Sequence, residues 1–214
     1  WSSWLLASST YMISFYIVGV ATILVRLCRS VWIGAQIRWA VRAIEDSAIT
    51  QVFTEQAAWL GLQRVPVLGL SDQVSVPVVV GILKPTILLP PAILCGLDPQ
   101  QIAAILSHEM AHIRRYDLLI NLMQRLVEAL LFFHPVTWWI SRRMSIERED
   151  CCDDMAVAGC GRLEFAGALL RMAELCAKNR GLSIGPQLEA MAADGGSPSQ
   201  LTRRVHRLLG ETSP

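Results

Sequence analysis

The chain has 214 residues and a formal net charge of +1, so its overall field gives no reason to expect direct binding to nucleic acid. Hydrophobic residues make up 53% of the sequence and charged residues only 17%, whereas ordinary soluble domains carry about 25% charged residues. This composition favours a protein associated with a membrane. The length suits one domain with a buried core plus an appendage.

The cysteines do not suggest a structural role through disulfides or through a zinc ribbon. They form no CxxC pair and no obvious ladder of bridges. We therefore expect reduced or buried thiols, which fit a catalytic portion that faces the cytosol. The six cysteines are Cys28, Cys95, Cys151, Cys152, Cys160 and Cys176. Because the sequence starts at Trp1 without a methionine, we treat it as a piece of a longer protein.

The first predicted element is a transmembrane helix. Residues 4–25 contain no charged side chain over 22 positions, which is about enough to cross a 30 Å hydrocarbon layer at 1.5 Å per residue. Basic residues follow before any acidic one, at Arg26, Arg29, Arg38 and Arg42. By the positive-inside rule this flank is cytoplasmic. We assign residues 1–27 to the transmembrane helix and residues 28–50 to a basic juxtamembrane segment.

The next region changes character and predicts short strands. Residues 65–70, 74–80 and 85–89 are rich in valine, isoleucine and leucine, and glycines and prolines lie between and within them. Pro77 lies within the middle run, and proline cannot donate a hydrogen bond to a neighbouring strand. This run is therefore predicted to be an edge strand.

A helix is predicted over residues 99–116. Asp98 can cap its start, Pro99 suits the first helical position, and Gln101 completes a capping box. Apolar residues recur with helical spacing and form the predicted buried side, at Ile102, Ile105, Leu106 and Ile113.

A second apolar run, residues 118–140, has two interpretations. Arg125 and Glu128 lie inside it three residues apart, and Pro135 interrupts it. We favour a buried or membrane-abutting helix over a second membrane span, and both remain open.

The rest of the chain is predicted to be helical except for one loop. Residues 141–157 form a charged helix, residues 162–179 an amphipathic one and residues 200–209 a short basic one. Residues 181–199 are rich in glycine, proline and serine, which indicates a loop.

The segment HEMAH lies on the predicted helix 99–116 and carries the clearest chemical signal. His108 and His112 are four residues apart, so both imidazoles lie on one face of the helix and can bind one zinc ion. Glu109 projects about 100° round the helix from His108 and can take a proton from a zinc-bound water. The alternative is that both are core histidines hydrogen-bonded to the backbone. Two weakly hydrophobic side chains would then lie on one apolar face without a chemical role.

A catalytic zinc needs a further protein ligand, and the residues alone leave several candidates. They are Glu128, His134, Glu147, Glu149, Asp150, Asp153 and the pair Cys151 and Cys152. Residues 147 to 153 follow the turn at Pro135, which can bring their helix back antiparallel to the preceding one. Glu149 and Asp153 are four residues apart, so one can ligate while the other supports a histidine.

Three stretches together resemble a known family. SVPVVVGILKPTILLPP, LSHEMAHIRRYDLL and EREDCCDDMAV occur in the order seen in the integral-membrane zinc metallopeptidases of the BlaR/MecR antibiotic-sensor group. The resemblance covers roughly residues 60–210. In that family an E-x-x-C-D element downstream of HExxH completes the zinc site, which implies Glu149 as the third ligand and Asp153 as its supporting residue. The spacing is similar in the related HtpX and CAAX-prenyl protease families.

The resemblance implies a fold and a path for the substrate. The fold would be α+β and mostly helical, a membrane-anchored gluzincin-like metalloprotease with a small sheet whose edge strand lies beside the HExxH helix. The peptidase domain would span residues 51–210. An extended substrate would pair with an edge strand, either the run that contains Val78, Val79 and Val80 or residues 85–89. A plain structural hairpin is an equal alternative. His134 could stabilise an oxyanion, although a capping role is the more common one at such a position.

The expected function is that of a zinc-dependent endopeptidase with one Zn²⁺ per chain. The resemblance implies a signal-transduction role in which a cytosolic regulator, such as a transcriptional repressor, is the protein substrate. It also implies an inner-membrane location, multi-pass in the full-length protein, with the zinc domain on the cytoplasmic side of the lipid bilayer. A membrane-protein quality-control protease and a non-catalytic receptor or scaffold are the alternatives, and the intact Glu109 argues against the last.

Overall fold

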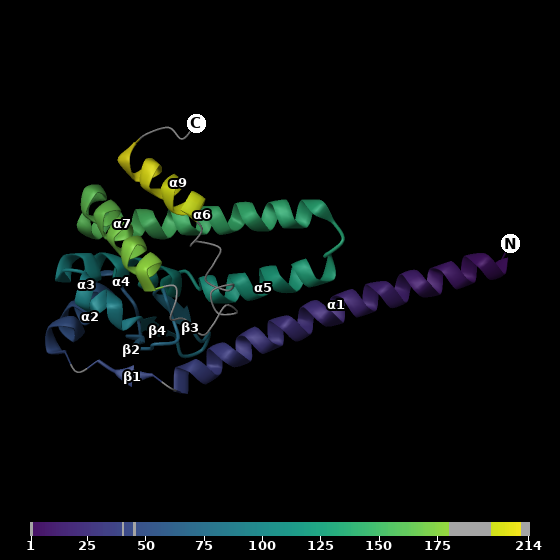
Figure 1. Cartoon of the computed structure of the whole chain (residues 1–214), viewed down its shortest axis with the longest axis horizontal. Coiled ribbons are helices and arrows are strands. Elements are labelled where there is room, and N and C mark those ends of the chain that lie inside the picture. The colour runs from purple at the N-terminus through teal and green to yellow at the C-terminus, as the bar shows by residue number, and fades with distance from the viewer. Residues whose placement is uncertain (1, 40, 45, 180–197, 211–214) are drawn as a thin grey trace.

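The computed structural model describes residues 2–39, 41–44, 46–179 and 198–210. Figure 1 shows a globular part from which one long helix extends toward the N-terminus. The elements, in chain order, are α1 (Ser2–Trp39), β1 (Arg42–Ala43), α2 (Ser47–Trp59), β2 (Val67–Leu70), β3 (Val78–Val80), β4 (Thr86–Leu89), α3 (Pro91–Gly96), α4 (Pro99–Arg114), α5 (Asp117–Leu130), α6 (Pro135–Cys160), α7 (Arg162–Asn179) and α9 (Pro198–Leu209). Most of the predicted loop 181–199 lies outside the described residues.

Helix α1 contains the predicted transmembrane segment. Its stretch Ser9–Arg38 is long and apolar enough to cross a membrane, and among the described residues it is the one helix that is. The helix does not end at residue 27 but continues through the basic residues to Trp39. The basic segment therefore begins as part of the same helix, because nothing in residues 26–38 breaks the helical pattern.

The strands form a small mixed sheet with the order β1-β2-β4-β3. β2 and β4 are parallel, and β3 pairs antiparallel with β4, with Val79 opposite Ile87. The prediction of three short strands is confirmed, and the run after Pro77 is an edge strand, as expected. The two-residue strand β1 was not predicted, because two residues carry no recognisable alternation.

Helix α4 begins with the predicted capping box. The side chain of Asp98 accepts a hydrogen bond from the Gln101 backbone at 2.8 Å, and the Gln101 side chain accepts one from the Asp98 backbone at 3.3 Å. The helix ends at Arg114, two residues earlier than predicted, because Tyr116 adopts a left-handed backbone with φ 58°. Residues that can adopt this conformation without strain are mainly glycine and asparagine, so its occurrence at a tyrosine could not be read from the sequence.

Helices α5 and α6 form an antiparallel hairpin that projects from the globular part beside α1 (Figure 1). The second apolar run is thus broken at Pro135, and Arg125 pairs with Glu128 at 2.9 Å, as the sequence suggested. α5 has 14 residues, a length of about 21 Å. It is too short to cross a hydrocarbon layer of about 30 Å by itself.

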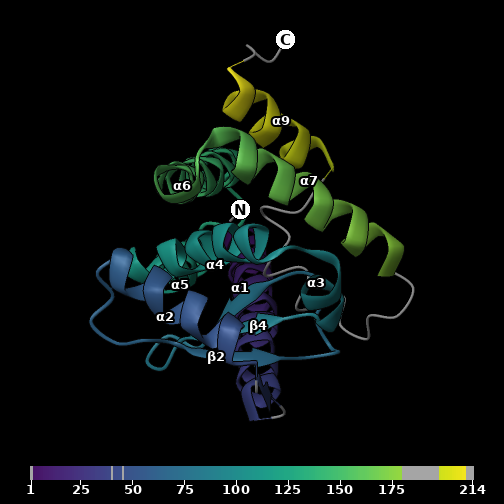
Figure 2. The ribbon, with the colours of Figure 1, turned by 90° about the vertical axis from the view of Figure 1, so that its left-hand side faces the viewer.

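The main core surrounds α4, which lies between the sheet with α2 on one side and α6 and α7 on the other (Figure 2). Its largest fully buried side chains include Phe165, Leu89, Leu106, Met110 and Leu169. A second, small cluster joins α1 to the sheet through Ile37, Val74, Val80 and Leu88. The helix that carries HEMAH is therefore held on both sides by packed side chains.

Candidate metal centre

The two histidines of HEMAH face each other across one turn of α4. The Nε2 atoms of His108 and His112 lie 3.2 Å apart, and both rings are largely buried. Two ring nitrogens at this distance repel one another when both carry lone pairs. A cation between them, or a proton, removes that repulsion.

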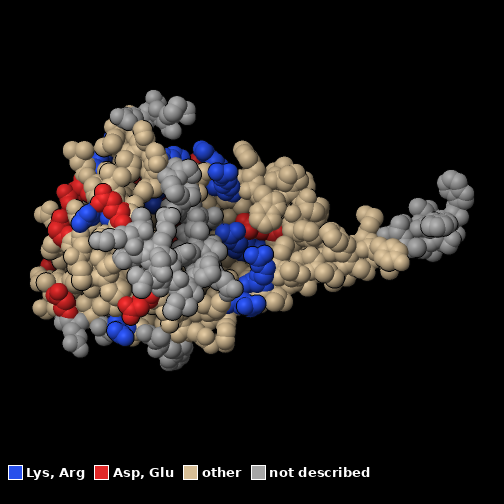
Figure 3. All heavy atoms as spheres, viewed as in Figure 1, with Lys and Arg blue, Asp and Glu red and all other residues tan. Residues whose placement is uncertain are grey.

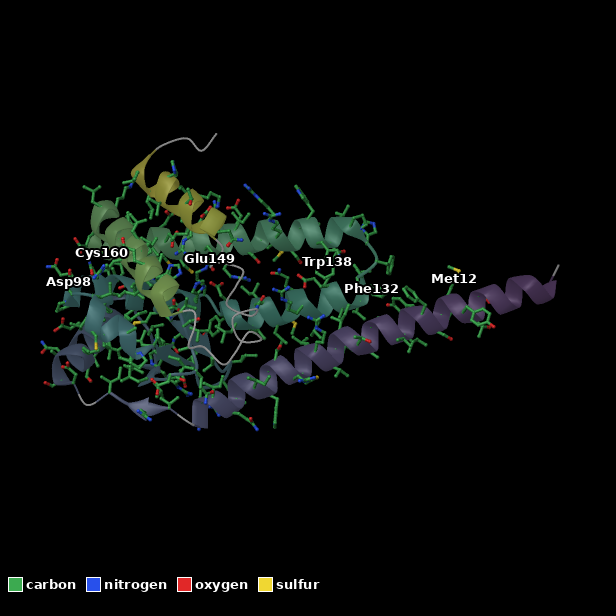
Figure 4. All side chains as sticks on the ribbon, viewed as in Figure 1. Met12, Asp98, Phe132, Trp138, Glu149 and Cys160 are labelled. Carbon is green, nitrogen blue, oxygen red and sulfur yellow. The ribbon has the colours of Figure 1, made fainter. Side chains whose placement is uncertain are left out.

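The antiparallel course of α6 brings Glu149 to the same point. Its carboxylate oxygens lie 3.5 Å from Nε2 of His108 and 3.6 Å from Nε2 of His112. Figure 4 places Glu149 on the part of α6 over the globular core, away from the tip of the hairpin where Phe132 lies. The ligand atoms of His108, His112 and Glu149 all lie within 4.8 Å of one another and form a group that can hold a metal ion.

The distances fit a tetrahedral zinc ion. Zinc binds histidine nitrogen and carboxylate oxygen at roughly 2.0–2.2 Å, so two ligands of a tetrahedron lie about 3.3–3.6 Å apart. The two histidine nitrogens are 3.2 Å apart, and each lies 3.5–3.6 Å from one of the two oxygens of the Glu149 carboxylate, so these separations have this size. Two nitrogens and one carboxylate oxygen are also a ligand set that zinc prefers in catalytic sites.

Three other acidic residues that the sequence offered as ligands are paired elsewhere. Glu147 is exposed and binds Arg143 at 2.6 Å, Glu128 binds Arg125, and Asp150 binds Arg203 at 2.8 Å. The structure thus brings Glu149 to the histidines and leads these three away from them.

Each histidine has its own carboxylate on the side away from the metal group. Nδ1 of His108 lies 3.0 Å from Oδ1 of Asp153, and Nδ1 of His112 lies 2.8 Å from Oδ2 of Asp117. Both carboxylates are buried. Contacts of this kind orient the rings and raise their basicity toward a metal. The buried thiol of Cys152 lies against the second pair, 3.3 Å from His112 Nδ1 and 3.4 Å from Asp117, and these three residues form a second group that could hold a metal ion.

Arg204 of α9 is buried beside this site. Its guanidinium forms a two-pronged ion pair with Asp153, lies 3.4 Å from Glu149, and approaches His108 Nε2 to 3.5 Å. The neighbouring Arg203 and Arg207 bind Asp150 and Asp154, so α9 is fastened to α6 by three arginines. The arginine charge offsets the two buried carboxylates next to His108.

The charges of the site shift its pKa values in opposite directions. Burial by itself lowers the pKa of His108, but the carboxylates of Asp153 and Glu149 outweigh it and raise the pKa to about 9. Burial by itself raises the pKa of Glu149, and contacts with the two histidines and Arg204 more than reverse this, so its pKa lies well below the usual value. A metal that binds here therefore meets an ionised carboxylate and displaces a proton from His108.

The metal group opens into a cavity of about 870 Å³. Glu109 lines this cavity together with the two histidines and Glu149. Val78, Val79 and Val80 of the edge strand β3 form part of another wall, and α1 and α5 complete it. The residue proposed as general base and the strand proposed for substrate pairing therefore share one cavity with the metal group.

The structure does not bring His134 to this site. It lies at the turn of the hairpin, where its Nδ1 accepts a hydrogen bond from Val136 N at 3.3 Å and caps α6. Glu149 lies fourteen residues after Pro135 on the same helix, which corresponds to about 21 Å.

Two residues at the site were not assigned a role from the sequence. Asp117 follows directly after the predicted helix 99–116, and the left-handed Tyr116 turns the chain so that Asp117 faces His112. Arg204 carried a recognisable signal. On α9 it shares a face with Leu201 and Leu208, so a charge lies on the apolar side of an amphipathic helix.

Comparison with known proteins identifies the family of the chain. Residues 5–208 match the family described as BlaR1 peptidase M56. The regulatory protein BlaR1 of Bacillus licheniformis is 25% identical over 138 residues, which cover 64% of this chain and 23% of that protein. The methicillin resistance mecR1 proteins of Staphylococcus aureus and Staphylococcus epidermidis are 26% identical over 83 residues, or 39% of this chain and 14% of theirs.

The chain thus spans less than a quarter of the length of the curated relatives it matches. The family match covers nearly the whole chain, from the apolar helix α1 to the arginine-bearing helix α9. The chain belongs to the BlaR1 peptidase M56 family.

Proposed function

We propose that this protein is a membrane-bound zinc endopeptidase. The observation that carries the proposal is the convergence of His108, His112 and Glu149 into one group that can hold a metal ion, with Glu109 on the wall of the adjoining cavity. Zinc held by these three residues would polarise a water molecule and lower its pKa toward 7.

Side chains around the metal group have the other roles in the reaction. The Glu109 carboxylate accepts the proton of the attacking water and then delivers it to the amide nitrogen of the cleaved bond. Asp153 and Asp117 hold the two imidazoles in the orientation that directs Nε2 toward the metal. Arg204 keeps Asp153 and Glu149 ionised in a buried place.

The substrate enters as an extended segment along β3. Among the described strands β3 has β4 on one side and no strand on the other, and Val78, Val79 and Val80 line the cavity. An edge strand with free backbone groups binds a peptide by adding it to the sheet, which holds the peptide bond extended beside the metal.

The membrane placement follows from α1. Its apolar stretch crosses the bilayer, and the arginines from residue 26 onward lie on the cytoplasmic side. The zinc site is attached after these arginines, so it faces the cytosol. Names of the relatives, a regulatory protein and resistance proteins, support a role in signal transduction. We therefore propose a cytosolic regulator, such as a transcriptional repressor, as the substrate.

The variant Glu109→Gln tests the hydrolase assignment. It should keep its zinc, because Glu109 is not a ligand, and should lose cleavage of a diverse peptide library scored by mass spectrometry of new termini. Glu147→Gln is the matched control, since Glu147 is an exposed glutamate paired with Arg143. Unchanged cleavage in the Glu109→Gln protein would show that the hydrolase assignment is wrong.

A further inference from the structure

The tip of the α5–α6 hairpin, residues 130–140, presents an apolar surface that the described residues leave uncovered. Its exposed side chains are 43–70% accessible and include Leu130, Leu131, Phe133, Val136, Trp139 and Ile140. Contiguous apolar surface of this kind marks contact with a protein or a membrane.

The tip packs against the apolar part of α1, not against the basic part. Phe132 sits where Gly19 leaves room, since a Cβ at Gly19 would lie 2.5 Å from the ring. The hydroxyl of Tyr16 donates to the carbonyl of Leu130 at 3.1 Å, and the Tyr16 ring stacks on Phe132. The apolar tip therefore lies directly against the apolar part of the proposed membrane helix, and Figure 4 shows Phe132 on the side of the hairpin that faces α1.

Arginines follow the apolar contact region at the same interval on both elements. Gly19 precedes Arg26 by seven residues on α1, and Pro135 precedes Arg142 by seven on α6. Each interval corresponds to about 10 Å along a helix. Figure 3 shows Lys and Arg gathered where the globular part meets the uncharged extension. Arg26, Arg29, Arg142 and Arg143 are exposed residues that bound the apolar surfaces there.

Three backbone carbonyls at the tip accept hydrogen bonds from groups of the protein itself. The indole of Trp138 donates to the carbonyl of Phe132 at 2.9 Å, and His134 N donates to the carbonyl of Leu131 at 2.9 Å. With Tyr16 on the carbonyl of Leu130, three successive carbonyls where α5 ends have partners within the protein. Water would satisfy such carbonyls on an exposed turn, whereas lipid cannot, so a turn in lipid requires internal partners.

The charges nearest the tip are also directed away from its surface. Glu128 is 3% exposed and accepts hydrogen bonds from Arg125 and Gln124. Gln124 in turn donates to the carbonyl of Ser141 on α6, inside the hairpin. Ionisable groups at membrane depth are found in this arrangement, paired and facing the protein interior.

We propose that residues 130–140 insert into the cytoplasmic leaflet beside α1, as a re-entrant tip that reaches about 10 Å below the arginines. The bound partner is the acyl-chain region of the bilayer. This inference rests on the proposed membrane crossing of α1. The cavity that holds the metal group is bordered by Arg26 of α1 and Arg125 of α5, so insertion of the tip would hold that cavity at the membrane surface.

Lipid photocrosslinking tests the proposal in the full chain reconstituted in lipid nanodiscs. A diazirine amino acid replaces one exposed residue at a time: Phe133 at the tip, Val18 on α1 as the positive control, and Leu163 on α7 as the negative control. All three side chains are more than half exposed, so the replacements leave the core intact. Lipid adducts are counted by mass spectrometry after illumination.

If the tip inserts, the number of lipid adducts at position 133 should be comparable to that at position 18. At position 163 it should not exceed the background measured without illumination. Adducts at Val18 without adducts at Phe133 would overturn the re-entrant tip and leave the α1 crossing intact. Absence at both positions would overturn the tip and the α1 crossing together. Equal labelling at all three positions would also overturn the proposal, because it indicates unspecific contact with lipid. The proposed peptide cleavage is tested separately by Glu109→Gln. Failure of the membrane-insertion proposal can therefore be distinguished from failure of the proposed hydrolase function.

Discussion

At the scale of single residues, the metal group depends on two carboxylates that do not bind the metal. Asp153 contacts His108, and Asp117 contacts His112, each at the nitrogen that faces away from the group. The two carboxylates come from different elements: Asp153 lies on the same helix as Glu149, and Asp117 begins the helix after HEMAH. The histidines are thus oriented independently of one another.

We expect Asp117→Ala to weaken zinc binding by about 10- to 100-fold, because His112 loses the acceptor that fixes its ring. Competition with a chelating dye measures the affinity. Asp72→Ala is the control, since Asp72 is an exposed aspartate away from the site. Asp117→Asn keeps an acceptor and should fall between Asp117→Ala and the unchanged protein. An affinity equal to that of the control would show that Asp117 does not support His112.

Arg204 is the residue on which the buried charges depend. We expect Arg204→Met to lower the free energy of unfolding of the zinc-free protein by about 3–5 kcal/mol, because the two buried carboxylates of Asp153 and Glu149 are then left with His108 alone to offset their charge. Arg204→Lys should restore only part of the loss, since lysine cannot form the two-pronged contact. Denaturant unfolding measures both.

Arg207→Met is the matched control for this experiment. Arg207 lies on the same helix and pairs with Asp154, but its side chain is 32% exposed. If Arg204→Met and Arg207→Met lower the free energy of unfolding by the same amount, the buried pair of Arg204 with Asp153 stabilises the protein no more than the exposed pair of Arg207 with Asp154.

At the scale of elements, the sequence predicted those features of helices and strands that depend on neighbouring residues. The capping box at Asp98, the edge strand after Pro77 and the break at Pro135 all depend on residues within a few positions. Contacts between distant elements were not predictable in the same way. Arg204 and Asp153 are 51 residues apart, and only the path of the chain joins them.

The choice of the third ligand shows this limit. Spacing alone could not separate Glu149 from Glu147, because both lie on the helix that returns over α4. The rotation of α6 about its axis decides between them, and packing of residues such as Cys152 and Ala156 against the core fixes that rotation. The family resemblance supplied Glu149, and the structure supplies the physical reason.

The turn between α4 and α5 offers a prediction at this scale. Tyr116 is 72% exposed and has a left-handed backbone, which costs a residue with a Cβ roughly 1–2 kcal/mol. We expect Tyr116→Gly to raise the free energy of unfolding by about 0.5–1 kcal/mol after the extra chain entropy of glycine is subtracted. Zinc affinity should not change. Tyr116→Ala is the control, because it removes the ring but keeps the strain, and an equal gain there would assign the effect to the ring.

At the scale of the whole molecule, α1 lines the cavity between two contacts with the rest of the protein. Near its C-terminus Ile37 packs with Val80 of the edge strand, and near its middle Gly19 receives Phe132 of the hairpin. The catalytic groups lie on α4 and α6, so α1 shapes the space beside the metal group without holding its ligands. Substrate binding and metal binding are therefore separable by substitutions on α1.

Gly19→Leu tests this separation. The larger side chain displaces Phe132 and moves the hairpin relative to α1, so we expect peptide cleavage, as kcat/KM, to fall by about tenfold or more, because small misplacements of the substrate are costly. Zinc affinity should stay unchanged, since none of the three ligands contacts this position. Gly167→Ala on α7 is the control, because a Cβ at Gly167 meets nothing within 4 Å and Gly167 is not among the residues that line the cavity. If Gly19→Leu also weakened zinc binding, then α1 would help to position the zinc ligands. Substrate binding and metal binding would not be separable by substitutions on α1.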